Sequence, residues 1–94
     1  MNLTKALLAT SALVITSGSA FAESMTLVSW GGAYQASQTK AYSDPYTAAN
    51  PDITIIWDES SAEAVAKLRA MNEAGNITWD LVDVEGADSI RLCD

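Results

Sequence analysis

Aromatic and acidic side chains occur where expected strands give way to turns. Trp30 and Tyr34 flank a pair of glycines after an apolar, β-favouring run. Aromatic rings at such a turn could hold a cation against their faces, a contact that contributes about 0.5–2 kcal/mol. Asp83 and Glu85 follow another strand-like run, and carboxylates are natural partners for an ammonium group taken out of water. These four residues are therefore candidates for binding a positively charged group.

A third polar run, residues 58–61, follows the strand-like segment 53–57. Ser60 and Glu63 have the spacing of a capping box, in which each side chain satisfies a backbone N–H of the other. A cap beside a cleft can also touch a ligand, so Ser60 is a further candidate. Structural alternatives stand beside these assignments: Trp30 could pack into the domain, the acids could form a solvated rim, and the glycines could simply make a tight turn.

Signatures of catalysis are nearly absent. The chain has no histidine, and Cys93 is its only cysteine. The nucleophile elbow, the phosphate-binding loop with lysine and the dinucleotide fingerprint are all missing. The acidic residues also fail the alternating pattern of a calcium loop. We therefore expect a binding protein rather than an enzyme, with no catalytic residues, no cofactor and no metal site.

The order of the expected elements predicts an α/β fold. Strands are expected at 25–30, 53–57 and 79–84, with helices over 33–42, from about 60 to 74, and over 87–92. Asp44-Pro45 should interrupt the first helix before a short helical turn through residue 49. Alternation of this kind implies a mostly parallel sheet. The strand ends, and with them the candidate residues, then meet at one edge of the sheet.

Residues 1–22 have the features of a secretory signal peptide. Lys5 precedes an apolar segment, and Ala20 and Ala22 occupy the small positions before a cut ahead of Glu23. A transmembrane anchor would need about 20 predominantly apolar residues, and residues 16–19 interrupt the run. We expect cleavage after Ala22 and a soluble periplasmic protein. The net charge of −7 argues against nucleic acid as a partner and is compatible with a cationic ligand.

Three segments resemble the start of periplasmic solute-binding proteins of ABC importers, most closely the spermidine/putrescine group: Val28-Ser29-Trp30-Gly31-Gly32-Ala33-Tyr34-Gln35, Asp44-Pro45-Tyr46-Thr47 and Trp79-Asp80-Leu81-Val82. The resemblance covers residues 23–94 but only the front part of such a protein. It implies a two-lobed type II binding-protein fold that closes on its ligand by hinge motion. It also implies delivery to an inner-membrane permease, and a monomer when the protein is complete.

The resemblance extends to individual ligand-binding positions. Trp30, Tyr34 and Ser60 match places where polyamine binders contact their ligand. The first turn departs from that pattern, because it is Gly-Gly-Ala where those proteins have polar residues. Asp83-Val84-Glu85 likewise stands where they have Val-Pro-Ser. The leading hypothesis is a receptor for a polyamine or similar cationic amine, and an amino-acid-like or opine-like ligand is the alternative within the same class.

A second class of hypothesis is a secreted α/β enzyme whose catalytic residues lie beyond Asp94. In either class, we expect residues 23–94 to be a partial first lobe, the βαβαβ start of an incomplete fold. Three strands would leave a sheet edge unpaired and apolar helix faces uncovered. We therefore expect this segment to bind ligand poorly and to unfold without sharp cooperativity when isolated.

Overall fold

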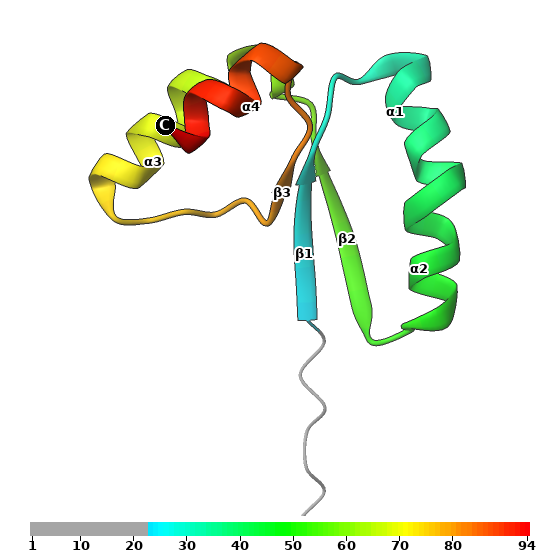
Figure 1. Ribbon diagram of the computed structural model, residues 1–94. Coiled ribbons are helices and arrows are strands. Elements are labelled where there is room, and N and C mark those ends of the chain that lie inside the picture. The colour runs from blue at the N-terminus through cyan, green and yellow to red at the C-terminus, as the bar shows by residue number, and fades with distance from the viewer. Residues whose placement is uncertain (1–22) are drawn as a thin grey trace, which may run out of the picture.

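The first strand of the described residues occupies the centre of a small sheet. The computed structural model describes residues 23–94, so the expected signal peptide lies outside the described residues. The chain follows the order β1 (Glu23–Val28), α1 (Gly32–Gln38), α2 (Asp44–Ala49), β2 (Ile53–Asp58), α3 (Ala64–Ala74), β3 (Leu81–Val82) and α4 (Gly86–Cys93). Figure 1 shows α1 and α2 on one side of the strands and α3 and α4 on the other.

The sheet is entirely parallel, with the strand order β2-β1-β3. β1 is in register with β2 over its whole length, from Glu23 opposite Ile53 to Val28 opposite Asp58. The pairing between β1 and β3 is short and places Val28 opposite Val82. The expected α/β fragment with a parallel sheet is confirmed. All three carboxyl ends lie at the upper edge in Figure 1.

The expected break at Asp44-Pro45 is wrong. α1 continues through a π-helical turn, Thr39–Ser43, directly into α2. The Asp44 N–H bonds to the Thr39 carbonyl, which is the wider hydrogen-bond pattern of a π turn. Because Pro45 has no N–H to donate, it is tolerated in the first turn of a helix, and here it lies at the start of α2. The wider turn ahead of it lets the helical path continue.

The expected capping box is also wrong. Ser60 makes no side-chain cap bond, and a 3₁₀ turn, Ser61–Glu63, precedes α3. Lys67 Nζ instead donates to Ser60 Oγ at 2.8 Å. Within residues 23–94 the ion pair that forms joins Asp88 and Arg91. α3 ends at Ala74, where the end of this helix was expected, and Gly75 with a φ of 67° takes the left-handed conformation of a helix end.

β3 is shorter than the expected strand 79–84. Asp80 uses both its backbone N–H and its carboxylate on Thr26 of β1, at 3.0 and 2.7 Å. Trp79 donates its indole N–H to Asp58 Oδ2 at 3.1 Å. These side-chain bonds hold the segment beside β1 without a regular ladder. The backbone N–H of Asp83 still reaches the Val28 carbonyl at 2.9 Å, so the chain stays aligned up to the edge of the sheet.

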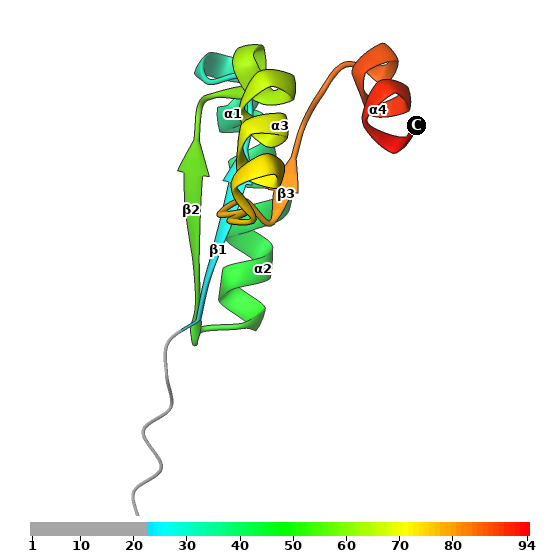
Figure 2. The same ribbon diagram turned by 90° about the vertical axis from the view of Figure 1, so that its left-hand side faces the viewer.

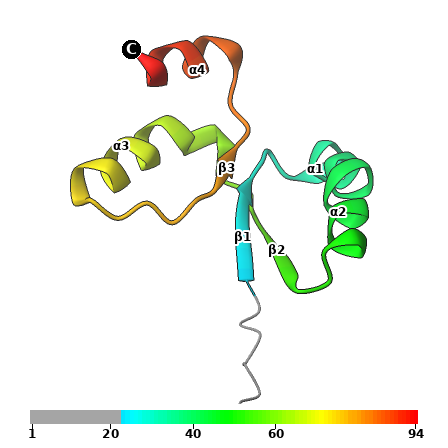
Figure 3. The same cartoon turned by 60° about the horizontal axis from the view of Figure 1, so that its bottom comes forward.

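Few side chains are fully buried in the described part of the chain. The buried apolar residues are Leu27, Val28 and Ala64. α3 and α4 overlap in Figure 1 but separate in Figures 2 and 3, and a gap of about 340 Å³ lies between them, lined in part by Leu68 and Leu92. No helix within residues 23–94 is long and apolar enough to cross a membrane. The described fold is thus an open α/β layer with a small core under the strand ends.

Candidate functional site

The turn after β1 brings two aromatic side chains to the edge of the sheet. Gly31 and Gly32 have φ values of 75° and 57°, a left-handed conformation that glycine adopts without a steric penalty. A Cβ on Gly31 would also come within 3.1 Å of Glu59 Oε2. This turn directs Trp30 and Tyr34 toward the carboxyl end of β3. The conformation of this tight turn therefore requires glycine, independently of any contact with a ligand.

Asp83 is the centre of the hydrogen bonding at this edge. Its Oδ2 accepts hydrogen bonds from Tyr34 Oη at 2.8 Å and from Gln38 Nε2 at 2.7 Å. The indole N–H of Trp30 points to Oδ1 at a longer 3.4 Å. Ser61 Oγ holds the main chain of Asp83 by donating to its carbonyl at 2.6 Å. One carboxylate thus joins the turn after β1, the helix α1 and the end of β3.

The charge on Asp83 affects Tyr34 directly. The hydrogen bond to the carboxylate, followed by repulsion between the two negative charges, raises the pKa of the Tyr34 phenol above its ordinary value. The phenol therefore stays protonated and remains a donor to Asp83 throughout the physiological pH range.

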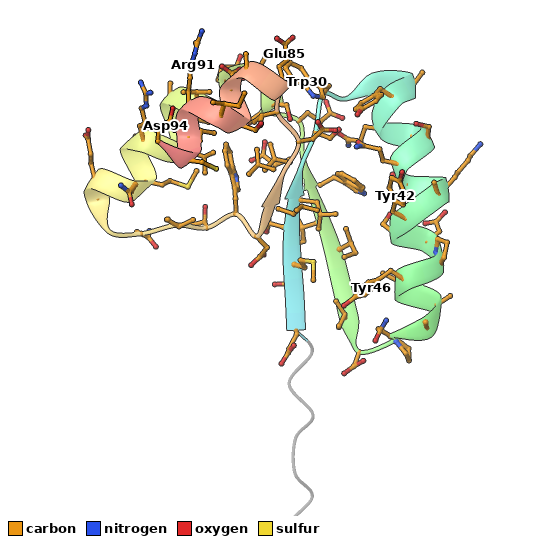
Figure 4. All side chains as sticks on the ribbon, viewed as in Figure 1. Trp30, Tyr42, Tyr46, Glu85, Arg91 and Asp94 are labelled. Atoms are coloured by element: carbon orange, nitrogen blue, oxygen red, sulfur yellow. The ribbon has the colours of Figure 1, made fainter. Side chains whose placement is uncertain are left out.

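An open hollow of about 390 Å³ lies over this cluster. It is lined by Trp30, Tyr34, Asp83, Val84 and Glu85. The side chains of Trp30 and Tyr34 are 40% and 54% exposed, so their ring faces are accessible. Figure 4 shows Trp30 and Glu85 together at the upper end of the sheet. An acidic and aromatic surface of this kind can receive an ammonium group together with a short apolar chain.

Four of the five candidate residues from the sequence line this hollow. Ser60 does not, and its hydroxyl lies between Asp58 and Lys67 instead. A hydrogen bond from Ser60 is the main cause of a lowered pKa for the Asp58 carboxyl, with Trp79 and Lys67 lowering it further. Ser60 therefore belongs to a polar cluster at the end of β2 and not to the hollow.

Two residues of the cluster were missed by sequence reasoning. Gln38 accepts a hydrogen bond from Ser29 Oγ with its side-chain oxygen and donates to Asp83 with its nitrogen. It lies four positions after Tyr34 and therefore on the same helix face, a signal that could have identified it. Ser61 was overlooked beside Ser60, and only its burial, with 4% exposed, and its contact with Asp83 distinguish it.

Within residues 23–94, no three histidine, cysteine, aspartate or glutamate side chains lie together as a metal site would require. The donors around Asp83 are phenol, amide and indole groups. They suit a carboxylate that is held in place by hydrogen bonds.

Comparison with known proteins gives a match to a curated binding protein. The chain is similar to the gamma-aminobutyric acid-binding protein of Pseudomonas aeruginosa, with 36% identity over 72 residues. The match covers 77% of this chain but 20% of the relative. The chain therefore spans about a fifth of the length of the curated relative that it matches. No family model and no solved structure gives a match.

Proposed function

We propose that this chain is the front part of the substrate-binding component of an ABC importer, which captures a small solute carrying an ammonium group in the periplasm. The observation that carries the proposal is the fixed Asp83 carboxylate beside the accessible rings of Trp30 and Tyr34. Similarity to a binding protein for a small amine-bearing molecule supports the same class of function. The hollow is one wall of the site, and the other wall is a second lobe.

The preferred ligand is a short amino acid with a terminal ammonium group, of the γ-aminobutyrate type. The relative's name favours this choice. Asp83 and Glu85 make this wall negative and so favour the ammonium end of the ligand, because they are the charged residues that line the hollow. The carboxylate of the ligand would then be held by the opposite wall.

A polyamine such as putrescine or spermidine is the second candidate. It is favoured by the two carboxylates at the hollow and by the net charge of −7. Both candidates place an ammonium group against the same wall. They differ in the group at the far end, which is cationic in a polyamine and anionic in an amino acid.

We propose binding rather than catalysis as the role of this site. The ionisable groups lining the hollow are Tyr34, Asp83 and Glu85. The raised pKa of Tyr34 is the opposite of what a general base near neutral pH needs. A secreted α/β enzyme with catalytic residues beyond Asp94 is the competing proposal. Reading the gene beyond that codon for a nucleophile motif or an acid pair would distinguish the two.

The test is calorimetric titration of the mature product of the gene with γ-aminobutyrate, putrescine, spermidine and butyrate. Butyrate is the matched control, because it keeps the chain and carboxylate of γ-aminobutyrate but lacks the ammonium group. We expect saturable binding of at least one amine and none of butyrate. Binding of both amine classes equally would remove the preference between them. Absence of heat with every amine would contradict the proposed function.

Location and partner need separate experiments. We expect cell fractionation to recover the mature product in the periplasm with Glu23 as its first residue. We also expect deletion of the gene to abolish high-affinity uptake of the amine identified by calorimetry. Recovery in the cytoplasm with residues 1–22 attached would contradict the proposed location.

A further inference from the structure

We infer that the two carboxylates of the hollow have different roles: Glu85 contacts the ammonium group of the ligand, whereas Asp83 positions the aromatic wall. This division rests on the proposed function and deepens it. It assigns the charge recognition to one residue and makes Gln38 and Ser61 positioning residues for the other.

The hydrogen-bonding capacity of Asp83 is largely used within the protein. A carboxylate oxygen has two acceptor positions, and both on Oδ2 are taken by Tyr34 and Gln38 at 2.8 and 2.7 Å. Oδ1 faces the Trp30 indole N–H, and the main-chain oxygen accepts from Ser61. An ammonium group would have to displace a short protein hydrogen bond to reach Oδ2. Asp83 is therefore better suited to fixing the two rings than to exchanging partners with a ligand.

The Glu85 side chain has the opposite character. It lies at the N-cap of α4 but makes no side-chain cap bond, and no ion pair involves it within residues 23–94. Its main chain is nonetheless held, since its carbonyl accepts the N–H groups of Asp88 and Ser89 at 2.9 and 3.0 Å. The carboxylate is thus an uncommitted acceptor on a fixed backbone.

This free carboxylate belongs to a residue that lines the same hollow as the two rings. Glu85 and Trp30 lie together at the carboxyl end of the strands in Figure 4, and both line the hollow with Tyr34. An ammonium group seated on the ring faces would therefore meet Glu85 without breaking any hydrogen bond of the protein. Ionic and aromatic contacts then act on the same group, which favours amines over uncharged analogues.

The test compares E85Q, D83N and the control E73Q in the mature product of the gene. Glu73 is an exposed acid on α3 that does not line the hollow, so E73Q removes the same charge elsewhere. Two quantities are measured. One is the Kd for γ-aminobutyrate or putrescine, whichever binds, at low and at high salt. The other is the Tyr34 titration, taken as the absorbance difference from Y34F.

We expect E85Q to raise the Kd at least tenfold, to flatten its salt dependence and to leave the Tyr34 titration unchanged. D83N should lower the Tyr34 pKa toward its ordinary value, because the carboxylate is the main cause of the raised value, and should weaken binding through the lost wall geometry. E73Q should match the unchanged protein in both measurements.

The inference and the proposed function fail in different ways. If E85Q binds the amine as tightly as E73Q does, the role assigned to Glu85 is overturned while the receptor function stands. If D83N leaves the Tyr34 titration unchanged, the role assigned to Asp83 is overturned, whatever ligand binds. If the unchanged protein binds neither amine, the proposed function is overturned and the inference with it.

Discussion

The carboxyl edge of the sheet and the sheet face below it differ in how many of their side chains have partners. At the edge the partners are hydrogen-bonding groups, and on the face they would be apolar side chains. Within the described residues, which include this edge, every buried side-chain nitrogen and oxygen atom has a hydrogen-bond partner. Below it, an apolar hollow of about 200 Å³ lies between the strands and α2. Tyr42, Tyr46 and Leu81 border this space and remain 68%, 40% and 62% exposed. Figure 4 shows both tyrosines on the side of the helix that faces the strands.

The difference reflects the range of the two kinds of interaction. A hydrogen bond needs two correctly placed groups, and neighbouring loops of one segment can supply both. Hydrophobic stabilisation grows with the apolar area removed from water, and a short chain buries a smaller fraction of its surface. Site geometry can therefore be well defined while the apolar face beneath it is still largely exposed.

The largest expected effect comes from a charge placed at the centre of the small core. Val28 is 2% exposed, so V28D buries an unpaired carboxylate and should lower the free energy of unfolding by several kcal/mol. L81D places the same group on an exposed position and should change the free energy of unfolding by less than about 1 kcal/mol. Urea denaturation of the two variants measures both values. Equal losses in the free energy of unfolding would mean that the two regions do not differ in how tightly they are packed.

A smaller effect is expected from the hydroxyl that holds Asp83. S61A removes the donor to the Asp83 carbonyl and should cost about 1–3 kcal/mol, because that carbonyl is left without its partner. S89A is the matched control, since Ser89 Oγ donates to the Gly86 carbonyl at an exposed position. Denaturation curves should rank S61A well below S89A in stability. The reverse order would show that Ser61 does not hold Asp83 in position.

The phenol of Tyr34 should give a stability change at alkaline pH. Its pKa is raised in the folded state by Asp83, so folding favours the protonated phenol. This contribution is fully present below the ordinary tyrosine pKa and is lost as pH rises through the folded pKa. Comparison of Tm against pH for the unchanged protein and Y34F measures it. Superimposable alkaline limbs would contradict the coupling between Tyr34 and Asp83.

The smallest expected effect belongs to the polar cluster at the end of β2. The Asp58 pKa is lowered, chiefly by a hydrogen bond from Ser60, so its contribution to stability is present above the ordinary aspartate pKa and is lost as pH falls through the folded pKa. D58N should flatten this acid limb, and D52N, in an exposed turn, should leave it unchanged. Trp79 fluorescence follows the transition, because its indole bonds to Asp58. A D58N curve that overlays the D52N curve would contradict this role.

The isolated segment tests the comparison as a whole. We expect residues 23–94 alone to unfold broadly, because the exposed residues around the apolar hollow add little stabilisation. Differential scanning calorimetry distinguishes this from a sharp transition. A single narrow peak with matching calorimetric and van't Hoff enthalpies would show that the small core suffices.

Local pattern was a good guide to the elements and a poor guide to their ends. The apolar runs at 25–30 and 53–57 identified two strands, because β-branched residues suit a covered parallel sheet. β3 was overextended because Trp79 and Asp80 bond to Asp58 and Thr26 instead of forming a ladder. The capping box had the correct spacing, but the Ser60 hydroxyl accepts from Lys67 and donates to Asp58 instead. The spacing of two residues does not reveal which other groups will bond to them.

The sequence by itself determined the order of strands and helices, the parallel sheet and the gathering of Trp30, Tyr34, Asp83 and Glu85 at one edge. Periodicity and turn residues act over a few positions, and parallel strands bring their carboxyl ends together. Only the tertiary structure decided that Asp83 is committed to protein donors while Glu85 is free, and that Ser60 belongs elsewhere. The commitment of Asp83 depends on contacts across more than 40 residues of chain, such as Tyr34 to Asp83 with a separation of 49, which local pattern does not encode.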